Sequence, residues 1–205
     1  MGFFDKLFGG GKKKKGSKET VQTRGAHMPD LKIPVDEKFT IQFKKNGGKF
    51  IYCDDFGEVL EGMKNIIQEN QWEQTPFYIL NPSLEERFSD QNIRFSRTAS
   101  DSEVFFTTCE HLIAQNGSIL VSSNQLLEKK LSEIPENIVV LATTSQLVES
   151  IGEGLKIIKK KYRQRIPANI TTLKHFKPTT EGDSVDFLTY GSSSKHLYLL
   201  LLEDL

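Results

Sequence analysis

Two polar loops carry the residues of this 205-residue chain whose types best suit binding of a small molecule. The first loop is Asn116-Gly117-Ser118, and the second comprises Gly191, Ser192, Ser193, Ser194, Lys195 and His196. Backbone N–H groups, hydroxyls and a lysine ammonium are donors that suit an anionic ligand. The simpler interpretation is that each loop only links two elements, because Gly and Ser are common in turns.

The common catalytic and metal-binding motifs are missing from the sequence. It contains no phosphate-binding glycine loop, no C-x-x-C, no H-E-x-x-H and no G-x-S-x-G. The four histidines share no metal-ligand spacing, so we expect neither a metal nor a cofactor. Cys109 and His111 invite a nucleophile and base assignment. Two residues apart on a helix they would not face each other, and a buried cysteine is usually a small hydrophobe.

Composition limits the class of protein. The chain has 27 basic and 27 acidic side chains, and this balance argues against a general nucleic-acid binder. No stretch approaches the ~20 apolar residues of a membrane-spanning helix. The two cysteines, Cys53 and Cys109, cannot form a disulfide framework, and no secretory signal is visible. We therefore expect a cytoplasmic protein with reduced thiols.

The N-terminal residues 1–27 differ from the rest, because they hold seven lysines and arginines against two acidic residues. Residues 9–25 are rich in Gly, Lys, Ser and Thr and are predicted to be a flexible linker. Within residues 2–15, four apolar side chains precede the lysines 12–15, a pattern typical of a weak membrane-surface anchor. Docking of this tail on the domain or on a partner is the alternative. We expect the domain itself to span residues 28–205.

Alternating helices and strands must position the two loops. Helices are predicted from Asp36, from Asp55, after Pro82, over 111–115 and from a capping box at Thr143 and Gln146. The predicted strands are short apolar segments, at 49–53, 77–80, 93–95, 104–106, 118–121, 138–141, 169–173 and 197–202. This alternation predicts an α/β protein with a mainly parallel sheet between helix layers.

Three segments have the spacing of motifs in one known family. Ile113-Ala114-Gln115-Asn116-Gly117-Ser118 is similar to a family segment Ile-Ala-(Glu/Asp)-Thr-Gly-Thr that precedes a strand. Lys177-Pro178-Thr179-Thr180-Glu181-Gly182-Asp183 is similar to Gly-Pro-Ser-(Arg/Lys)-Thr-Ala-Asp. Gly191 stands eight residues after Asp183, where the family has Gly-Val-His-Gly-Pro before its last strand. The chain therefore resembles the LUD domain, the LutC/YkgG-type lactate-utilisation family, over roughly residues 35–205.

The resemblance implies a three-layer α/β/α fold of the kind shared with ribose-5-phosphate isomerase, glucosamine-6-phosphate deaminase and CoA transferases. It also implies a role in conversion of L-lactate to pyruvate, alongside iron–sulfur partner proteins. The chain has no clustered cysteines, so it looks like the cluster-free member of such a set. It departs from the family at Thr180, Glu181 and Ser193, where the family has Arg/Lys, Thr and His. It would then be a divergent member.

Three functions follow as hypotheses. The first is an accessory or regulatory subunit in oxidation of L-lactate or another 2-hydroxy acid, without a redox centre of its own. Its small-anion pocket would be lined by the two loops and the segment between them: Asn116, Gly117, Ser118, Thr179, Thr180, Asp183, Gly191, Ser192, Ser193, Ser194, Lys195 and His196. The second is a non-catalytic scaffold tethered by its N-terminal tail. The third is a sugar-phosphate or CoA-type enzyme of the same fold, with Asp183 or Glu110 as the catalytic carboxylate.

Overall fold

The computed structural model describes residues 33–174, 176 and 195–204. At its centre lies a six-stranded sheet in which every pair of neighbouring strands is parallel. The strands, in their order across the sheet, are β1 (Lys49–Cys53), β10 (His196–Leu202), β7 (Asn137–Thr143), β4 (Val104–Thr108), β2 (Phe77–Ile79) and β3 (Phe95–Ser96).

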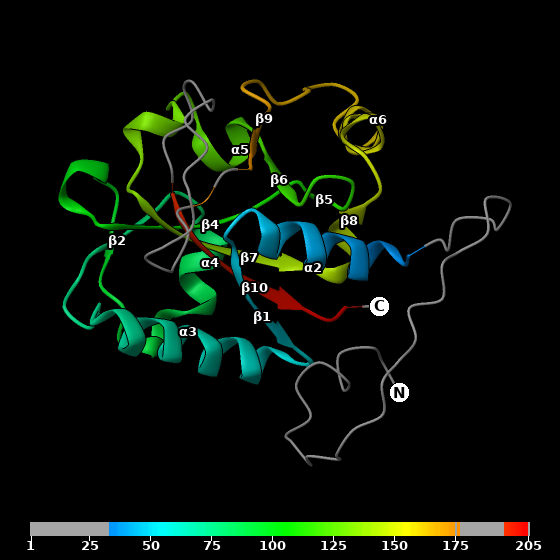
Figure 1. Ribbon diagram of the computed structural model, residues 1–205. Coiled ribbons are helices and arrows are strands. Elements are labelled where there is room, and N and C mark those ends of the chain that lie inside the picture. Colours follow the sequence, from blue (N-terminus) through cyan, green and yellow to red (C-terminus); the bar gives the residue numbers. More distant parts are fainter. Residues whose placement is uncertain (1–32, 175, 177–194, 205) are drawn as a thin grey trace, which may run out of the picture.

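Helices cover both faces of this sheet (Figure 1). One face packs against α3 (Phe56–Asn70) and α4 (Pro82–Arg87), and the other against α2 (Val35–Lys45) and a second, smaller sheet. The smaller sheet has the order β8 (Leu147–Val148), β5 (His111–Ile113), β6 (Ser118–Val121) and β9 (Thr171–Leu173). The helix α6 (Ile151–Lys161) covers its outer side. The remaining short elements are α5 (Ser123–Leu126) and the 3-10 turns 89–91, 99–101, 131–133 and 144–146.

The most apolar segment of the sequence forms the buried strand β10. Its side chains alternate, so that Leu197, Leu199 and Leu201 join the core beneath α2, while Tyr198 and Leu200 join the core beneath α3. Strands covered on both faces are apolar at every position, which explains why this segment reads as a continuous hydrophobic run. The predicted α/β fold with a mainly parallel sheet between helix layers is confirmed.

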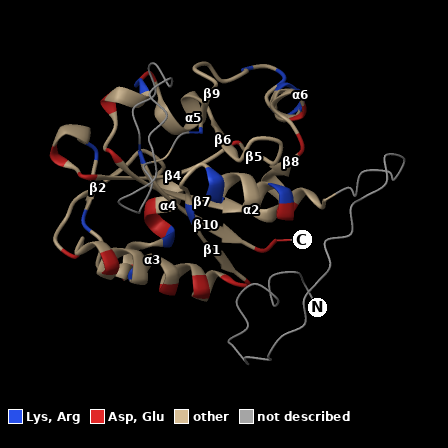
Figure 2. Cartoon of the chain, viewed as in Figure 1, with Lys and Arg blue, Asp and Glu red and all other residues tan. Residues whose placement is uncertain are grey.

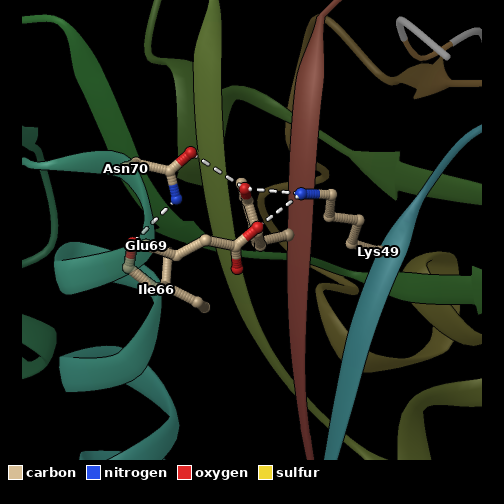
Figure 3. A network of polar contacts seen from close by, with 5 residues as sticks. Lys49, Ile66, Glu69 and Asn70 are labelled. Carbon is tan, nitrogen blue, oxygen red and sulfur yellow. Dashed lines mark hydrogen bonds and ion pairs between the residues drawn. The ribbon is translucent and has the colours of Figure 1, made fainter. Parts of the chain in front are cut away.

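The long helix α3 is capped at its start and tied to the sheet at its end. At its start, the Asp55 carboxylate accepts a hydrogen bond from the backbone N–H of Glu58 at 3.0 Å. At its end, the Lys49 ammonium donates to Glu69 at 2.8 Å and to the Tyr198 hydroxyl at 3.0 Å, and that hydroxyl donates to Asn70 at 2.9 Å (Figure 3). This network ties β1, β10 and α3 together.

Two predicted helices are wrong in detail, for a common reason. The segment predicted as a helix over 111–115 is the strand β5, which turns at Gly117 and pairs antiparallel with β6. A three-residue apolar run has no readable period, so its pairing with β6 and β8 decides its conformation. The capping box at Thr143 and Gln146 forms, but it closes a 3-10 turn. The helix α6 starts later, where the Ser150 hydroxyl accepts from the Glu153 N–H.

The helix α6 places its charges as the helix dipole favours. Glu153 lies in its first turn, and Lys159, Lys160 and Lys161 lie in its last turn (Figure 2). Among the residues that the structure describes, no helix is long and apolar enough to cross a membrane.

Candidate functional site

A polar cavity of about 360 Å³ opens at the carboxyl ends of β4 and β7. In open parallel sheets, ligands bind at this edge, just beyond the strand ends. The chain leaves β4 at Thr108 and passes through Cys109 and Glu110 into the smaller sheet, so the cavity lies where the two sheets meet. Its lining side chains with polar or charged groups include Asn81, Arg87, Glu110, Asn124, Gln125, Thr143, Gln146, Lys161 and Tyr162.

Glu110 lines this cavity although only 5% of the residue is exposed. Its Oε1 accepts hydrogen bonds from the Ser122 hydroxyl and the Asn124 amide, both at 2.7 Å. Its Oε2 accepts a longer one, at 3.3 Å, from the Tyr162 hydroxyl. An ionised carboxylate offers about four acceptor positions, so Oε2 retains capacity for a hydroxyl or amine of a ligand.

The backbone around Glu110 is fixed by neighbouring elements. The Glu110 N–H donates to the carbonyl of Leu120 at 2.8 Å, and the Gln146 amide donates to the carbonyl of Cys109 at 2.7 Å. Ser122, which binds the Glu110 carboxylate, also caps the short helix α5 with Gln125 in a capping box. The carboxylate is therefore held in one position before any ligand arrives, which limits the entropic cost of binding.

Two cations stand at the mouth of the cavity. Arg87 ends α4, with its guanidinium 4.2 Å from the centre of the Phe56 ring. Lys161 ends α6, with its ammonium 5.1 Å from the centre of the Tyr162 ring. Both residues are exposed, so their side chains can turn toward an anion. One fixed carboxylate, two cations and several amides together suit a small molecule that carries both a carboxylate and a hydroxyl.

Cys109 and His111 point to different places and form no pair. Cys109 belongs to the core beneath α2, and burial, with a contribution from the Glu110 charge, raises the pKa of its thiol well above the ordinary range. The His111 Nδ1 lies 3.3 Å from the carbonyl oxygen of Gln146, and burial lowers the pKa of the imidazole. A neutral thiol is a poor nucleophile, so this geometry gives Cys109 no catalytic role.

The Asn116-Gly117-Ser118 turn packs on the end of α2, at the closed end of the β5–β6 hairpin. The Asn116 Oδ1 accepts from the Ser118 N–H and hydroxyl, at 3.1 and 2.7 Å. The Asn46 amide donates to the carbonyls of Asn116 and Gly117, at 2.8 and 3.1 Å. Gly117 has φ +65°, and a Cβ there would stand 2.3 Å from the backbone N of Phe43. The polar groups of this turn bind one another and Asn46.

Lys195 and His196 lie at the amino end of β10, the sheet edge opposite to Glu110. Lys195 is buried, and its ammonium donates to the carbonyls of Ile134 and Pro135 at 2.9 and 3.3 Å. It forms a β-bridge with Phe176, whose N–H donates to the Asn46 carbonyl at 3.1 Å. The structure thus links Lys195 to the Asn116 turn through Phe176 and Asn46. The other predicted site residues lie outside the described part of the chain: Thr179, Thr180, Asp183, Gly191, Ser192, Ser193 and Ser194.

Comparison with models of protein families shows which family this chain belongs to. The model of the LUD domain matches residues 37–202, which is most of the chain. The chain belongs to the LUD domain family. It is a lactate-utilisation-related domain protein, as its sequence motifs predicted. A comparison with curated proteins gave no match.

The LUD-domain fold is also found in a solved structure. This chain is similar to the crystal structure of a DUF162 family protein from Deinococcus radiodurans, determined at 1.70 Å. The TM-score is 0.58 at 11% sequence identity, and the match covers 82% of this chain and 96% of the other. At this identity the likeness concerns the fold alone.

The sequence pointed to Glu110 only as an alternative carboxylate and did not identify the other residues that line its cavity. Arg87, Asn124 and Tyr162 come from three separate elements, and nothing in their spacing links them. One signal was present: Glu110 stands two residues after the end of β4, whereas residues 191–195 precede β10. The rule that ligands bind beyond the carboxyl ends of strands therefore pointed to Glu110. Among the described residues, no group of three or more His, Cys, Asp or Glu is arranged to hold a metal ion.

Proposed function

We propose that this LUD-domain protein is an accessory or regulatory subunit in the oxidation of L-lactate, or a closely related 2-hydroxy acid, to pyruvate. In this proposal, iron–sulfur partner subunits carry the electrons, and this chain binds the small organic acid. The family supports the link to lactate utilisation. The observation that supports a bound acid is the buried Glu110 carboxylate in a polar cavity flanked by Arg87 and Lys161.

The chemistry of a 2-hydroxy acid matches this cavity. Its carboxylate would pair with the guanidinium of Arg87 or the ammonium of Lys161, because charge-assisted hydrogen bonds are the strong ones. Its hydroxyl would donate to Glu110 Oε2, the carboxylate oxygen with a single long contact to Tyr162. The volume of about 360 Å³ lies at the small end of the range for ligand sites, roughly 300–1,000 Å³.

We prefer this cavity to the pocket predicted from the two loops, most of whose residues lie outside the described part of the chain. Among the described members of that set, the polar groups of the 116–118 turn bind one another and Asn46, and the Lys195 ammonium binds two backbone carbonyls. The cavity at the opposite edge of the sheet offers a buried charged group beside two exposed cations. We therefore place the small-anion site at Glu110.

A second candidate function is an enzyme of the sugar-phosphate or CoA class. The position of Glu110 favours it, because a carboxylate fixed by Ser122 and Asn124 could accept a proton from a bound substrate. Arg87 and Lys161 would then bind a phosphate. The two candidates share the same site and differ in ligand and in turnover.

Binding calorimetry separates them. We expect the full-length chain to bind L-lactate or pyruvate, and the variants Glu110→Gln and Arg87→Gln to weaken binding by about tenfold or more, as for loss of one charged hydrogen bond. Arg163→Gln, a neighbouring exposed arginine that does not line the cavity, is the matched control and should leave binding unchanged.

Two results would reject the accessory-subunit proposal. One is the lack of any heat of binding with L-lactate and pyruvate at millimolar concentration. The other is turnover of ribose 5-phosphate, glucosamine 6-phosphate or an acyl-CoA that Glu110→Gln abolishes, since this would identify the chain as an enzyme. Co-purification of iron–sulfur proteins with the tagged chain tests the partner, and their absence would remove it from the proposal.

A further inference from the structure

In the described part of the chain, the smaller sheet ends in a strand with one unpaired edge. β9 pairs antiparallel with β6, with Thr171, Thr172 and Leu173 opposite Val121, Leu120 and Ile119. It is the last strand in the order β8-β5-β6-β9, and among the described residues no strand pairs with its other edge. An open strand edge presents backbone N–H and C=O groups that can pair with another extended chain.

A groove of about 700 Å³ follows this open edge. Thr171, Thr172 and Leu173 all line it. Successive side chains of a strand point to opposite faces of a sheet, so a groove lined by three in a row lies along the strand edge and not over one face. The segment 126–132, which follows β6 and includes the end of α5, lines the same groove.

The groove combines apolar and basic side chains. Leu126, Leu173 and Phe176 are buried residues of the core that reach its surface. Its charged lining residues, within the described part of the chain, are four lysines and one glutamate: Lys129, Lys130, Lys174, Lys195 and Glu128. The groove is therefore positive, although the whole chain has a formal net charge of zero.

We propose that this groove binds an acidic segment of a partner protein, which adds to β9 as a further strand. Backbone pairing with β9 would supply direction and register, since strand addition uses main-chain hydrogen bonds for affinity. Lys129, Lys130 and Lys174 would select acidic side chains by charge complementarity. β9 is about 10 Å long at the usual rise per residue, which matches three residues of an extended peptide.

A peptide fits the groove better than a nucleic acid or a lipid headgroup does. The open edge alternates donors and acceptors, and an extended peptide backbone matches both, whereas a phosphate offers acceptors only. The groove also lies at the amino ends of the large sheet, opposite to the Glu110 cavity, so its occupant is separate from the small acid proposed above.

Fluorescence anisotropy of the full-length chain with three labelled heptapeptides tests the proposal. The first alternates Glu or Asp with Val, the second has Lys in place of each acid, and the third is the acidic peptide with alternate backbone nitrogens methylated. We expect the acidic peptide to bind, with an affinity that falls as salt is raised. The basic and the methylated peptides should bind at least about tenfold more weakly.

A charge-reversal pair locates the site. Lys129→Glu with Lys174→Glu changes two groove lysines, and Lys156→Glu with Lys159→Glu makes the same change of charge on α6. The groove variant should bind the acidic peptide at least about tenfold more weakly, and the α6 variant should bind it as the wild type does.

Several outcomes overturn the proposal. They are no binding of the acidic peptide, equal binding of the methylated peptide, and equal weakening by the two charge-reversal variants. Displacement of the peptide by inorganic phosphate at millimolar concentration would indicate a simple anion site instead. Self-association that only the groove variant abolishes, measured by analytical ultracentrifugation, would identify a second copy of this chain as the occupant.

Discussion

Replacing Gly117 by alanine tests whether the 116–118 turn serves packing. Gly117 has φ +65°, a conformation that costs a residue with a Cβ about 1–2 kcal/mol. The added Cβ would also stand 2.3 Å from the backbone N of Phe43 and 2.3 Å from the backbone C of Gln42. Backbone atoms of α2 cannot rotate away as a side chain can, and overpacking of this kind costs about 1–3 kcal/mol.

The two terms together predict a loss of about 2–5 kcal/mol in the free energy of unfolding. For a domain of this size, each kcal/mol lowers Tm by about 2–4 °C, so Gly117→Ala should lower Tm by roughly 4–20 °C. Calorimetry or thermal unfolding followed by circular dichroism measures the shift. If the turn serves packing only, L-lactate binding by the folded variant at low temperature should match the wild type.

A second glycine provides the control. A Cβ on Gly152, in the first turn of α6, would have the Ser150 hydroxyl as its nearest neighbour, at 3.9 Å. Gly152→Ala should therefore leave Tm unchanged or raise it slightly, because alanine favours the helix by about 0.5–1 kcal/mol. The reasoning fails if Gly117→Ala unfolds within 2 °C (roughly one kcal/mol or less) of the wild type, or if both variants lose the same stability.

Three further predictions follow. Burial raises the pKa of Cys53 to about 12 and that of Cys109 still further, so both thiols should react with Ellman's reagent only after unfolding; fast labelling of the native protein would contradict this. Burial disfavours the charged form of Lys49, but hydrogen bonds to Glu69 and Tyr198 outweigh it and raise the pKa. The stability that this network supplies should be complete below pH 10.5 and should be lost as pH rises through the higher folded-state pKa of Lys49. Urea unfolding of Lys49→Met should not show this loss of stability at high pH. An identical pH dependence of the two proteins would refute the prediction. Deletion of residues 2–15 should reduce co-sedimentation with anionic liposomes if the tail is the surface anchor, and equal co-sedimentation of both chains would remove that hypothesis.

The large sheet was predictable because its strands carry their own signals. The strand at 49–53 was placed correctly, and the runs at 138–141 and 197–202 lie within β7 and β10. These segments are apolar and bounded by turn residues, so burial alone specifies them. The smaller sheet was predictable in part, because residues 118–121 form β6 and the predicted strand 169–173 contains β9. Its strands β5 and β8 have three and two residues, and neither was predicted as a strand, because such short segments depend on pairing with other strands.

The candidate site was even harder to predict from the sequence than the short strands. Glu110 was recognised as one of two carboxylates, but its environment comes from Arg87, Asn124 and Tyr162, on three different elements. Their convergence follows from strand order and from the crossing of the chain between the sheets, which no local pattern encodes. Lys195 was predicted from its charge to contact an anion, and in the described part of the chain its ammonium donates to two backbone carbonyls.

The position of the bound acid tests the central claim most directly. We would titrate the ¹⁵N-labelled chain with L-lactate and follow the backbone amide signals. The Glu110 cavity predicts saturable shifts at Glu110, Asn124, Gln125 and Tyr162, with the amide of Lys195 unaffected. Shifts confined to Lys174, Phe176 and Lys195, or no shift at millimolar L-lactate, would contradict the account.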